Sequence, residues 1–195
     1  MARTGYVKRA TRETDIALSL DLDGGGDVCV STGVPFFDHM LDALGRHALF
    51  ALDVAATGDL AVDAHHTVED VGICLGQAFA EALGDKRGIR RYGSQFVAMD
   101  EALVLAAVDI SGRGQLHYDL AMPIELIGTF DTTLAKEFMT AFAANAGITV
   151  HVVGFAGENA HHIIEAAFKA LARALAEAVE IDPRVSGVPS TKGSL

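Results

Sequence analysis

Apolar positions along the chain follow two distinct periods. Every second residue is apolar over residues 16–22, which predicts a strand at residues 15–22. Three glycines fall within residues 23–27 and predict a turn, after which residues 28–30 would return as a hairpin partner of that strand. The chain is therefore expected to begin with sheet structure.

Helical spacing of apolar residues dominates two longer segments. It predicts amphipathic helices over residues 66–83 and 162–179, and shorter helices from Pro35 and over residues 132–145. Strand patterns occupy residues 49–55, 96–98, 103–110, 115–120 and 148–153. The order of strands, helix, strand and helix thus occurs twice. We expect an α+β chain of two similar half-domains in tandem, residues 1–92 and 93–195, each a mixed sheet with helices packed on one face.

A histidine motif follows the same repeat. The sequence HHTVE at residues 65–69 recurs as HHIIE at residues 161–165, an offset of 161 − 65 = 96 residues. Both copies stand at the start of a predicted long helix. The positive end of a helix dipole disfavours imidazolium there, so the histidines are expected to be neutral and able to bind a metal.

Helix geometry limits how each copy can bind metal. Adjacent helical residues diverge by about 100°, whereas residues three or four apart share a face. Each glutamate can therefore reach a metal beside one histidine of its pair, and the two histidines are better suited to two different ions. Imidazole and carboxylate ligands without thiolate suit manganese, iron or zinc in an open site.

An alternative explanation treats the first histidines as helix caps and the glutamates as ordinary acids of the first turn. Recurrence in two matched contexts favours metal. Each motif also has a predicted upstream ligand in the preceding helix, His39 for the first and Glu137 for the second. Glu137 could instead be an exposed residue paired with Lys136 or with solvent. The predicted metal ligands are His39, His65, His66, Glu69, Glu137, His161, His162 and Glu165.

The net charge and hydrophobic content of the chain exclude some classes of binding partner. Half of the 195 residues are hydrophobic, and the formal net charge is −11. Such an acidic chain is not expected to bind nucleic acid or an anionic membrane. No apolar run approaches the roughly 20 residues that span a bilayer, and residues 1–15 contain no apolar segment typical of a secretory signal. A cytoplasmic location with reduced thiols at Cys29 and Cys74 is expected.

Other residues point to an anion site. Arg113 lies between two glycines after a predicted strand, a backbone that allows close approach of an anion. Lys169 follows Glu165 by one helical turn, and spacing alone fits an ion pair as well as a site role. Residues 182–195 are rich in proline, glycine and serine, a composition typical of disorder.

These segments together resemble the imidazoleglycerol-phosphate dehydratase family over nearly the whole chain. The similarity is carried by RET, FFDHML, GDL, HHTVED, LGDKRGI, MDE, SGR, HHIIEA and PSTKG at residues 12–14, 36–41, 58–60, 65–70, 83–89, 99–101, 111–113, 161–166 and 189–193. Three positions depart from the family's usual residues: Ala64, Gly114 and Glu137, where members often have aspartate, proline and histidine.

The resemblance implies a lyase of histidine biosynthesis that dehydrates imidazole glycerol phosphate to imidazole acetol phosphate through a metal-bound imidazolate. It further implies two manganese ions per subunit, a ribosomal protein S5 domain 2-like fold and a homo-oligomer of 24 subunits with metal sites between subunits. The implied catalytic residues are Glu13, Glu69 and Glu165. The implied substrate-binding residues are Glu13, His47, Arg91, Arg113, Lys169, Ser190 and Lys192.

Two other classes of protein would use the same ligands. A carboxylate-bridged di-metal oxidase or iron-storage protein also combines histidine with glutamate, but it requires a four-helix bundle with Glu-x-x-His motifs. A metal-stabilised assembly protein without catalysis would explain the histidine pairs. It would leave the turn at Arg113 and the tail at Ser190 and Lys192 without a role.

Overall fold

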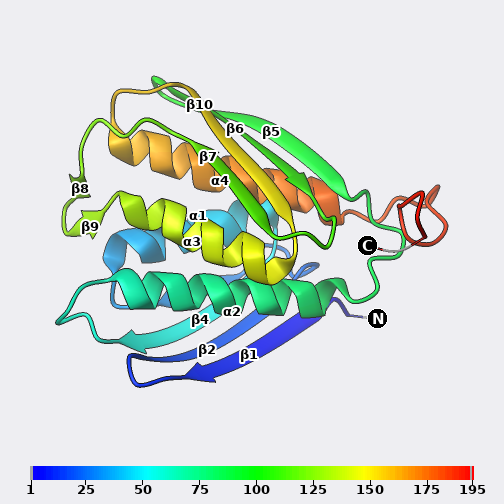
Figure 1. Cartoon of the computed structure of the whole chain (residues 1–195), viewed down its shortest axis with the longest axis horizontal. Helices are drawn as coiled ribbons and strands as arrows, with labels where there is room; N and C mark the ends of the chain where they lie inside the picture. The colour runs from blue at the N-terminus through cyan, green and yellow to red at the C-terminus, as the bar shows by residue number, and fades with distance from the viewer. Residues whose placement is uncertain (1, 194) are drawn as a thin grey trace.

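The computed structural model describes residues 2–193 and 195 (Figure 1). The first half contains β1 (Thr4–Ala10), β2 (Thr14–Asp21), β3 (Val28–Ser31), α1 (Pro35–Ala48), β4 (Ala51–Gly58) and α2 (His65–Leu83). The second half contains β5 (Tyr92–Met99), β6 (Ala102–Asp109), β7 (Gln115–Asp119), the short β8 (Leu126–Ile127) and β9 (Phe130–Asp131), α3 (Thr133–Ala146), β10 (Thr149–Ala156) and α4 (Ala160–Val179).

The two halves have the same sheet topology. The strand order is β1-β2-β4-β3 in the first sheet and β5-β6-β10-β7 in the second. In each sheet three strands are antiparallel, and the last strand, β3 or β7, is parallel to its neighbour. The predicted fold class, two similar mixed-sheet halves with helices on one face, is confirmed.

Strand β3 corrects one prediction. Residues 28–30 were expected to form a hairpin with residues 15–22, but β3 pairs in parallel with β4 at the far edge of the sheet. The helix α1 connects these two parallel strands, as a parallel pair requires a crossover. The neighbours of β2 are β4 and β1, and β1 was not predicted from the sequence.

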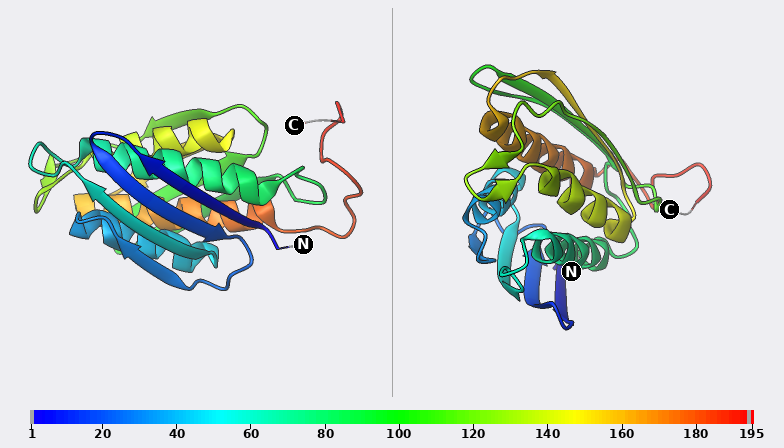
Figure 2. Two further views of the ribbon diagram at one scale, coloured as in Figure 1. Left: turned by 90° about the horizontal axis from the view of Figure 1, so that it is seen from below. Right: turned by 60° about the vertical axis from the view of Figure 1, so that its left-hand side comes forward.

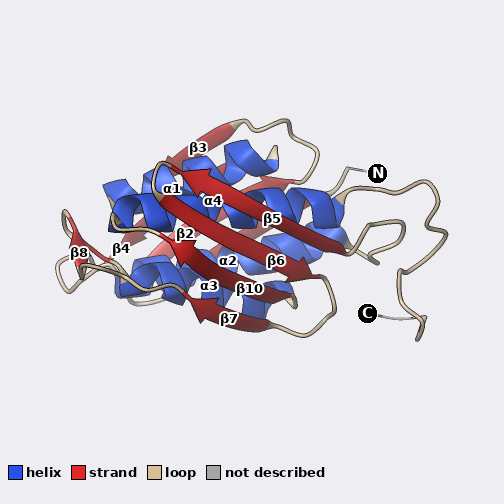
Figure 3. Cartoon of the chain, turned by 90° about the horizontal axis from the view of Figure 1, so that it is seen from above, coloured by secondary structure: helices blue, strands red, loops and turns tan. Residues whose placement is uncertain are grey.

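The helices lie between the two sheets (Figure 2). Within each half, one long helix covers the first two strands: α2 packs on β1 and β2, and α4 packs on β5 and β6. Across the halves, α1 packs against α4 and α2 against α3. Figure 3 shows the second sheet, β5, β6, β10 and β7, in front of this helical layer. The protein is therefore a sheet–helix–helix–sheet sandwich whose core is shared by both halves.

Aromatic rings join the halves at the centre. Phe138 of α3 lies with its ring centroid 5.3 Å from that of Phe37 in α1 and 5.3 Å from that of Phe168 in α4, and Phe142 contacts Phe79 of α2 at 5.6 Å. All five are almost completely buried. Contacts of this kind add to the hydrophobic stabilisation of burial. Among the described residues, no helix combines the length and apolar character needed to cross a membrane.

The closest approach between α2 and α3 depends on glycine. A Cβ atom at Gly76 would lie 2.7 Å from the carbonyl oxygen of Phe142 and 2.9 Å from the backbone nitrogen of Ala146. Gly72 is similarly close to the carbonyl oxygen of Phe138, at 2.8 Å. These atoms belong to the backbone of α3 and cannot rotate away.

Gly76→Ala should therefore destabilise the protein. Alanine favours the helix by about 1 kcal/mol over glycine, but overpacking costs about 1–3 kcal/mol, and here it requires a backbone shift. We expect the free energy of unfolding to fall by about 1–2 kcal/mol, measured by urea denaturation. The exposed neighbour Gln77→Ala is the control, expected to change it by less than about 0.5 kcal/mol. A Gly76→Ala variant as stable as its parent would contradict the packing account.

Candidate metal centre

Three predicted ligands converge where α1 meets α4. His39 Nε2 lies 3.3 Å and His161 Nε2 lies 3.0 Å from Glu165 Oε2. One ligand atom from each of the three residues lies within 4.8 Å of the others. His161 and Glu165 share a face of α4 because they are four residues apart, and the cross-half packing brings His39 to them. The arrangement suits one divalent cation.

The carboxylate of Glu165 is buried and charged. Its side chain is 8% exposed, and Lys169 Nζ lies 2.7 Å from Oε1. Burial alone would raise the pKa of Glu165, but the ammonium of Lys169 and the hydrogen bond with His39 lower it below its ordinary value. The negative charge is thus retained at the point where a cation would bind.

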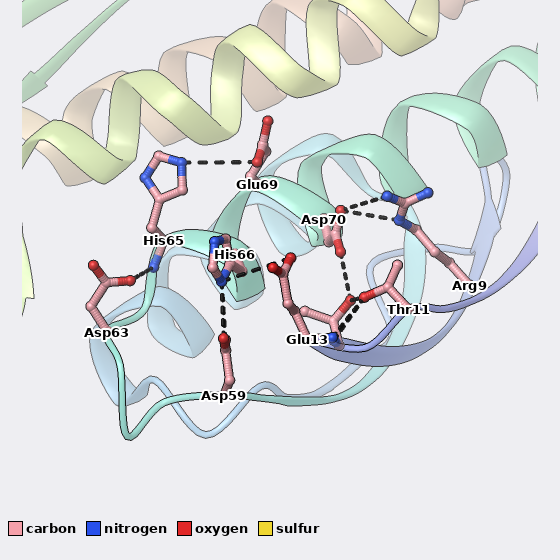
Figure 4. Close-up of polar contacts among 10 residues, drawn as sticks. Arg9, Thr11, Glu13, Asp59, Asp63, His65, His66, Glu69 and Asp70 are labelled. Carbon is pink, nitrogen blue, oxygen red and sulfur yellow. Dashed lines mark hydrogen bonds and ion pairs between the residues drawn. The ribbon is translucent and has the colours of Figure 1, made fainter.

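The repeat places a more open counterpart where α3 meets α2. His65 Nε2 lies 3.9 Å from Glu69 Oε2 (Figure 4). Glu137 is the fifth residue of α3, as His39 is the fifth residue of α1, and α3 packs on α2 as α1 packs on α4. Among the described residues, Glu137 does not join His65 and Glu69 in a cluster as close as the first one.

The upstream ligands were assigned to the wrong motifs. His39 was expected beside the first motif, which follows it in the sequence, but the structure places it at Glu165 of the second motif. The reason is that each shorter helix packs on the long helix of the other half. Glu137 correspondingly lies on α3, which packs against α2, the helix of Glu69, and not against α4 as the sequence prediction required.

The second histidine of each pair faces another carboxylate. Asp59 Oδ2 lies 3.0 Å from Nδ1 of His66, and Glu101 Oε2 lies 2.7 Å from Nδ1 of His162. Hydrogen bonding to Asp59 raises the pKa of His66, and hydrogen bonding to Glu101 raises that of His162. The same contact lowers the pKa of Glu101 to about 2. When the imidazole is neutral, the proton lies on Nδ1, and Nε2 is left as the atom that can bind a metal.

Both histidine pairs diverge. The rings of His65 and His66 are inclined at 86°, and those of His161 and His162 at 78°, with centroids 5.9 and 6.2 Å apart. Neither His66 nor His162 joins the close cluster found among the described residues. The two rings of each pair therefore face different directions, and the number of ions that each motif serves stays a prediction.

Glu13 lies in the turn between β1 and β2, beside the first motif. Its Oε2 is 3.9 Å from His66 Nδ1, and its side chain is 53% exposed (Figure 4). It is therefore a carboxylate in contact with solvent at the edge of the first histidine motif.

The predicted anion-binding residues fall into two groups. The first group is His47, in the last turn of α1, and Lys169 of α4, which pairs with Glu165. Burial and the nearby charges of Lys169 and Arg173 lower the pKa of His47. The second group is Arg91, which donates a hydrogen bond to the carbonyl of Pro189, and Arg113, whose neighbour Gly112 lies beside Leu195. These residues therefore lie with the tail at the end of the molecule where the C-terminus is drawn (Figure 1). The structure does not bring the two groups together within the chain.

At that far end, Asp109 holds two arginines. It accepts hydrogen bonds from Nε and Nη2 of Arg91 at 2.7 and 3.2 Å, and Arg113 Nη2 lies 3.7 Å away. Arg91 is 13% exposed and also donates from Nη1 to the carbonyl of Pro189, whereas Arg113 is 62% exposed. Arg91 therefore anchors the tail, and Arg113 is accessible to an anion.

The tail is more ordered than its composition indicates. The amide of Asp182 donates to the carbonyl of Gly88, and the amide of Gly88 donates to the carbonyl of Gly187. Within the tail, the amide of Lys192 donates to the hydroxyl of Ser190 at 3.2 Å. The side chains of Ser190 and Lys192 are thereby presented in a turn at the end that also carries Arg113.

A family model described as imidazoleglycerol-phosphate dehydratase matches residues 32–175, which include both histidine motifs. The chain belongs to the imidazoleglycerol-phosphate dehydratase family. The imidazoleglycerol-phosphate dehydratase of Symbiobacterium thermophilum is 62% identical over 193 residues, 99% of this chain and 93% of its own length. Among solved structures, the dehydratases of Staphylococcus aureus and Pyrococcus furiosus each have 38% identity, with TM-scores of 0.84 and 0.85. They cover 92% and 97% of this chain, and 99% and 100% of their own.

Two residues of this dehydratase-family site were missed as functional candidates, Asp59 and Glu101. Both lie in short family segments, GDL and MDE, but neither belongs to the histidine repeat. Asp59 follows β4 and Glu101 lies in the turn between β5 and β6, so their contacts arise from different elements. No periodic signal in the sequence links them to His66 and His162.

Metal binding should weaken as the pH falls toward and below about 6.5, the ordinary pKa of histidine. Imidazole must be neutral to bind metal, and the raised pKa values of His66 and His162 place the onset of protonation higher than for free histidine. Titration of the metal-free chain with Mn²⁺ by calorimetry from about pH 8 to pH 6 measures this. His117→Ala, a change on β7 outside both motifs, should leave the profile unchanged. Affinity independent of pH over this range would contradict histidine ligation.

Proposed function

We propose that this chain dehydrates imidazole glycerol phosphate to imidazole acetol phosphate in histidine biosynthesis, using two divalent metal sites. Family membership supports a hydro-lyase with this reaction. The observation that carries the metal part is the convergence of His39, His161 and Glu165, with ligand atoms within 4.8 Å of one another.

The donor atoms fit manganese. Two neutral imidazoles and a charged carboxylate form a site of mixed nitrogen and oxygen ligands, which hard and borderline divalent cations accept. His39, His161 and Glu165 would hold one ion, and His65, Glu69 and Glu137 would be the corresponding half-site for a second. His66 and His162 would complete sites with neighbouring copies. A bound cation would supply a Lewis acid that favours loss of the imidazole N–H proton of the substrate.

The carboxylates differ in their freedom to transfer protons. Elimination of water requires a proton on the leaving hydroxyl and loss of a hydrogen from the adjacent carbon. Glu165 is held by Lys169 and two histidines and is nearly buried, so we assign it to ligation. Glu69 faces His65 within the second half-site. Glu13 is exposed and outside both ligand sets, which makes it our first choice as the acid/base residue and Glu69 our second.

The substrate's phosphate requires cations and hydrogen-bond donors. Arg113, Ser190 and Lys192 offer them at the tail end of the molecule, with Arg91 as the anchor of the tail. Lys169 and His47 offer a second set beside Glu165. We assign all six to substrate binding.

The distance between the predicted metal ligands and the phosphate-binding residues of the tail favours an active site shared between subunits. The predicted metal ligands gather at the starts of α2 and α4, whereas the tail follows the far end of α4, and Gly112, the neighbour of Arg113, lies beside Leu195 of that tail (Figure 1). A single small phosphate ester cannot bridge the two. We infer active sites shared between subunits and a homo-oligomer of 24 copies, with two manganese ions per subunit. The cytoplasmic location is also part of this proposal and rests on the family.

The rival classes predict different behaviour. A di-metal oxidase or iron-storage protein would bind its ions inside a four-helix bundle, but here the helices are covered by sheets on both sides, and the cluster lies at helix ends (Figure 2). A metal-stabilised assembly protein would bind manganese without turnover. An activity measurement therefore distinguishes the assembly protein from the dehydratase.

The deciding experiment supplies imidazole glycerol phosphate and Mn²⁺ to the purified chain and measures the enolisable keto phosphate. The parent should form product, and Glu13→Gln should lose roughly 10²-fold or more in kcat with its manganese retained. Metal content is determined by elemental analysis of the same samples. Manganese bound without product would favour the assembly protein and contradict the proposed function.

Glu137 should behave as a metal ligand. Glu137→Gln removes the charge and should weaken manganese binding by about 10-fold or more, whereas Glu137→His should restore binding, since His39 is an imidazole at the equivalent position. Lys136→Ala on the same helix is the control. Calorimetric titration and kcat provide the readouts. If Glu137→Gln binds manganese and turns over like the parent, water or another group completes that half-site.

Lys192 should act on binding rather than on chemistry. Because its proposed partner is the phosphate, which does not react, Lys192→Ala should raise KM by about 10-fold and change kcat by less than about twofold. Lys8→Ala, a loss of an exposed lysine on β1, serves as the matched control. Steady-state kinetics identical to those of the parent would remove the tail from the substrate site.

A further inference from the structure

A buried polar network lies directly behind the turn that carries Glu13. Asp70, on the inner face of α2, is 6% exposed, and Thr14, the first residue of β2, is 4% exposed. The hydroxyl of Thr14 donates to Asp70 Oδ2 at 2.5 Å. Arg9 of β1 reaches Oδ1 of the same carboxylate through Nε and Nη2, each at 3.0 Å (Figure 4). Neither Asp70 nor Thr14 is a metal ligand or contacts the substrate groups assigned above.

The network continues into the backbone of Glu13. Thr11 Oγ1 accepts hydrogen bonds from the amides of Glu13 and Thr14, both at 3.0 Å, and lies 3.2 Å from Thr14 Oγ1. The amide of Thr11 donates to the carbonyl of Thr14 at 2.8 Å and closes the turn. Glu13 is thus held through its backbone while its side chain projects toward His66.

The carboxylate of Asp70, at one end of this series of contacts, determines the direction of each hydrogen bond between the hydroxyl groups. A carboxylate only accepts, so the single hydroxyl hydrogen of Thr14 is committed to Asp70. Thr11 must then donate its hydroxyl hydrogen to Thr14, and its oxygen is free to accept the amide of Glu13. The hydroxyl groups of Thr11 and Thr14 both donate in the direction of Asp70, an order in which successive bonds strengthen one another.

The second half provides an internal comparison. Ala166 occupies the repeat position of Asp70, 96 residues later, and Ala102 is the first residue of β6 as Thr14 is of β2. Both alanines are buried. At the turn between β5 and β6, buried alanines thus stand where the first half has its polar network, and Glu101 of this turn accepts hydrogen bonds from the amides of Glu158 and Asn159 instead. Among the described residues, the network of Asp70, Thr14 and Thr11 has no counterpart behind that turn. A buried carboxylate and hydroxyl are costly to retain for packing alone.

We propose that Asp70, Thr14 and Thr11 are positioning residues that fix Glu13 relative to the first histidine motif. Asp70 lies on the same helix as His66 and Glu69. The hydrogen-bonded network of Asp70, Thr14 and Thr11, here called the relay, therefore connects the acid/base residue to the metal ligands through one rigid helix. This inference rests on the proposed role of Glu13. Reaction geometry is sensitive to displacements of about 1 Å, so loosening the turn should slow chemistry without preventing substrate binding.

Thr14→Val tests the relay because it removes the hydroxyl but keeps the branched shape and the pair of Arg9 with Asp70. We expect kcat to fall about tenfold, KM to change by less than about twofold, and bound manganese to stay at the parent level. The amide of Glu13 should exchange with solvent about fivefold faster, measured by hydrogen exchange. Thr14→Ser, which restores the hydroxyl, should recover both values.

A matched control separates positioning from general support of the same two elements. Glu81 of α2 accepts a hydrogen bond from the amide of Tyr6 in β1 at 3.0 Å, at the far end of the same helix. Glu81→Ala should leave kcat and the exchange of the Glu13 amide unchanged. If it reproduces the effect of Thr14→Val, the relay has only a structural role.

A double variant decides whether the effect passes through Glu13. Thr14→Val added to Glu13→Gln should lower kcat no further than Glu13→Gln alone, because the positioned carboxyl group is already absent. An additional tenfold loss would overturn the proposal, as would a Thr14→Val variant with parental kcat and amide exchange. Full activity of Glu13→Gln by itself would instead refute the acid/base role on which the proposal rests.

Discussion

Packing of each shorter helix on the long helix of the other half is the constraint on which the site depends. The glycines at positions 72 and 76 allow α2 to approach α3, and Phe37, Phe138 and Phe168 fill the space between the halves. Since metal ligands must be held within tenths of an ångström, a shared, close-packed core is a suitable support. The same packing brings His39 from one half to Glu165 of the other, at 3.3 Å.

Duplication then produces sites with similar ligands but different surroundings. The second motif has a compact trio with a buried, lysine-paired glutamate, whereas the first has an open half-site and a carboxylate relay behind Glu13. An elimination needs both a firmly held ring and a mobile proton. We relate the compact trio of the second motif to the first requirement and the exposed Glu13, in the turn beside the first motif, to the second.

The sequence was sufficient to predict the repeat, most of its strands and helices, and the histidine motifs, because these depend on local periodicity and spacing. It did not predict β1, where Gly5 is the buried residue and the apolar alternation is weak. It also misassigned the partners of β3 and of His39, since both depend on contacts between distant segments. Asp59 and Glu101 were missed because turn residues acquire their partners only when the sheets and helices are assembled.

Anomalous X-ray diffraction at the manganese absorption edge, from crystals of the full chain grown with Mn²⁺, tests the central claim most directly. The account predicts an anomalous peak coordinated by His39, His161 and Glu165, which joins ligands from the two halves. It also predicts a second peak at His65 and Glu69. A manganese ion bound by His39 together with the first motif, or peaks that avoid the trio altogether, would contradict the cross-half site.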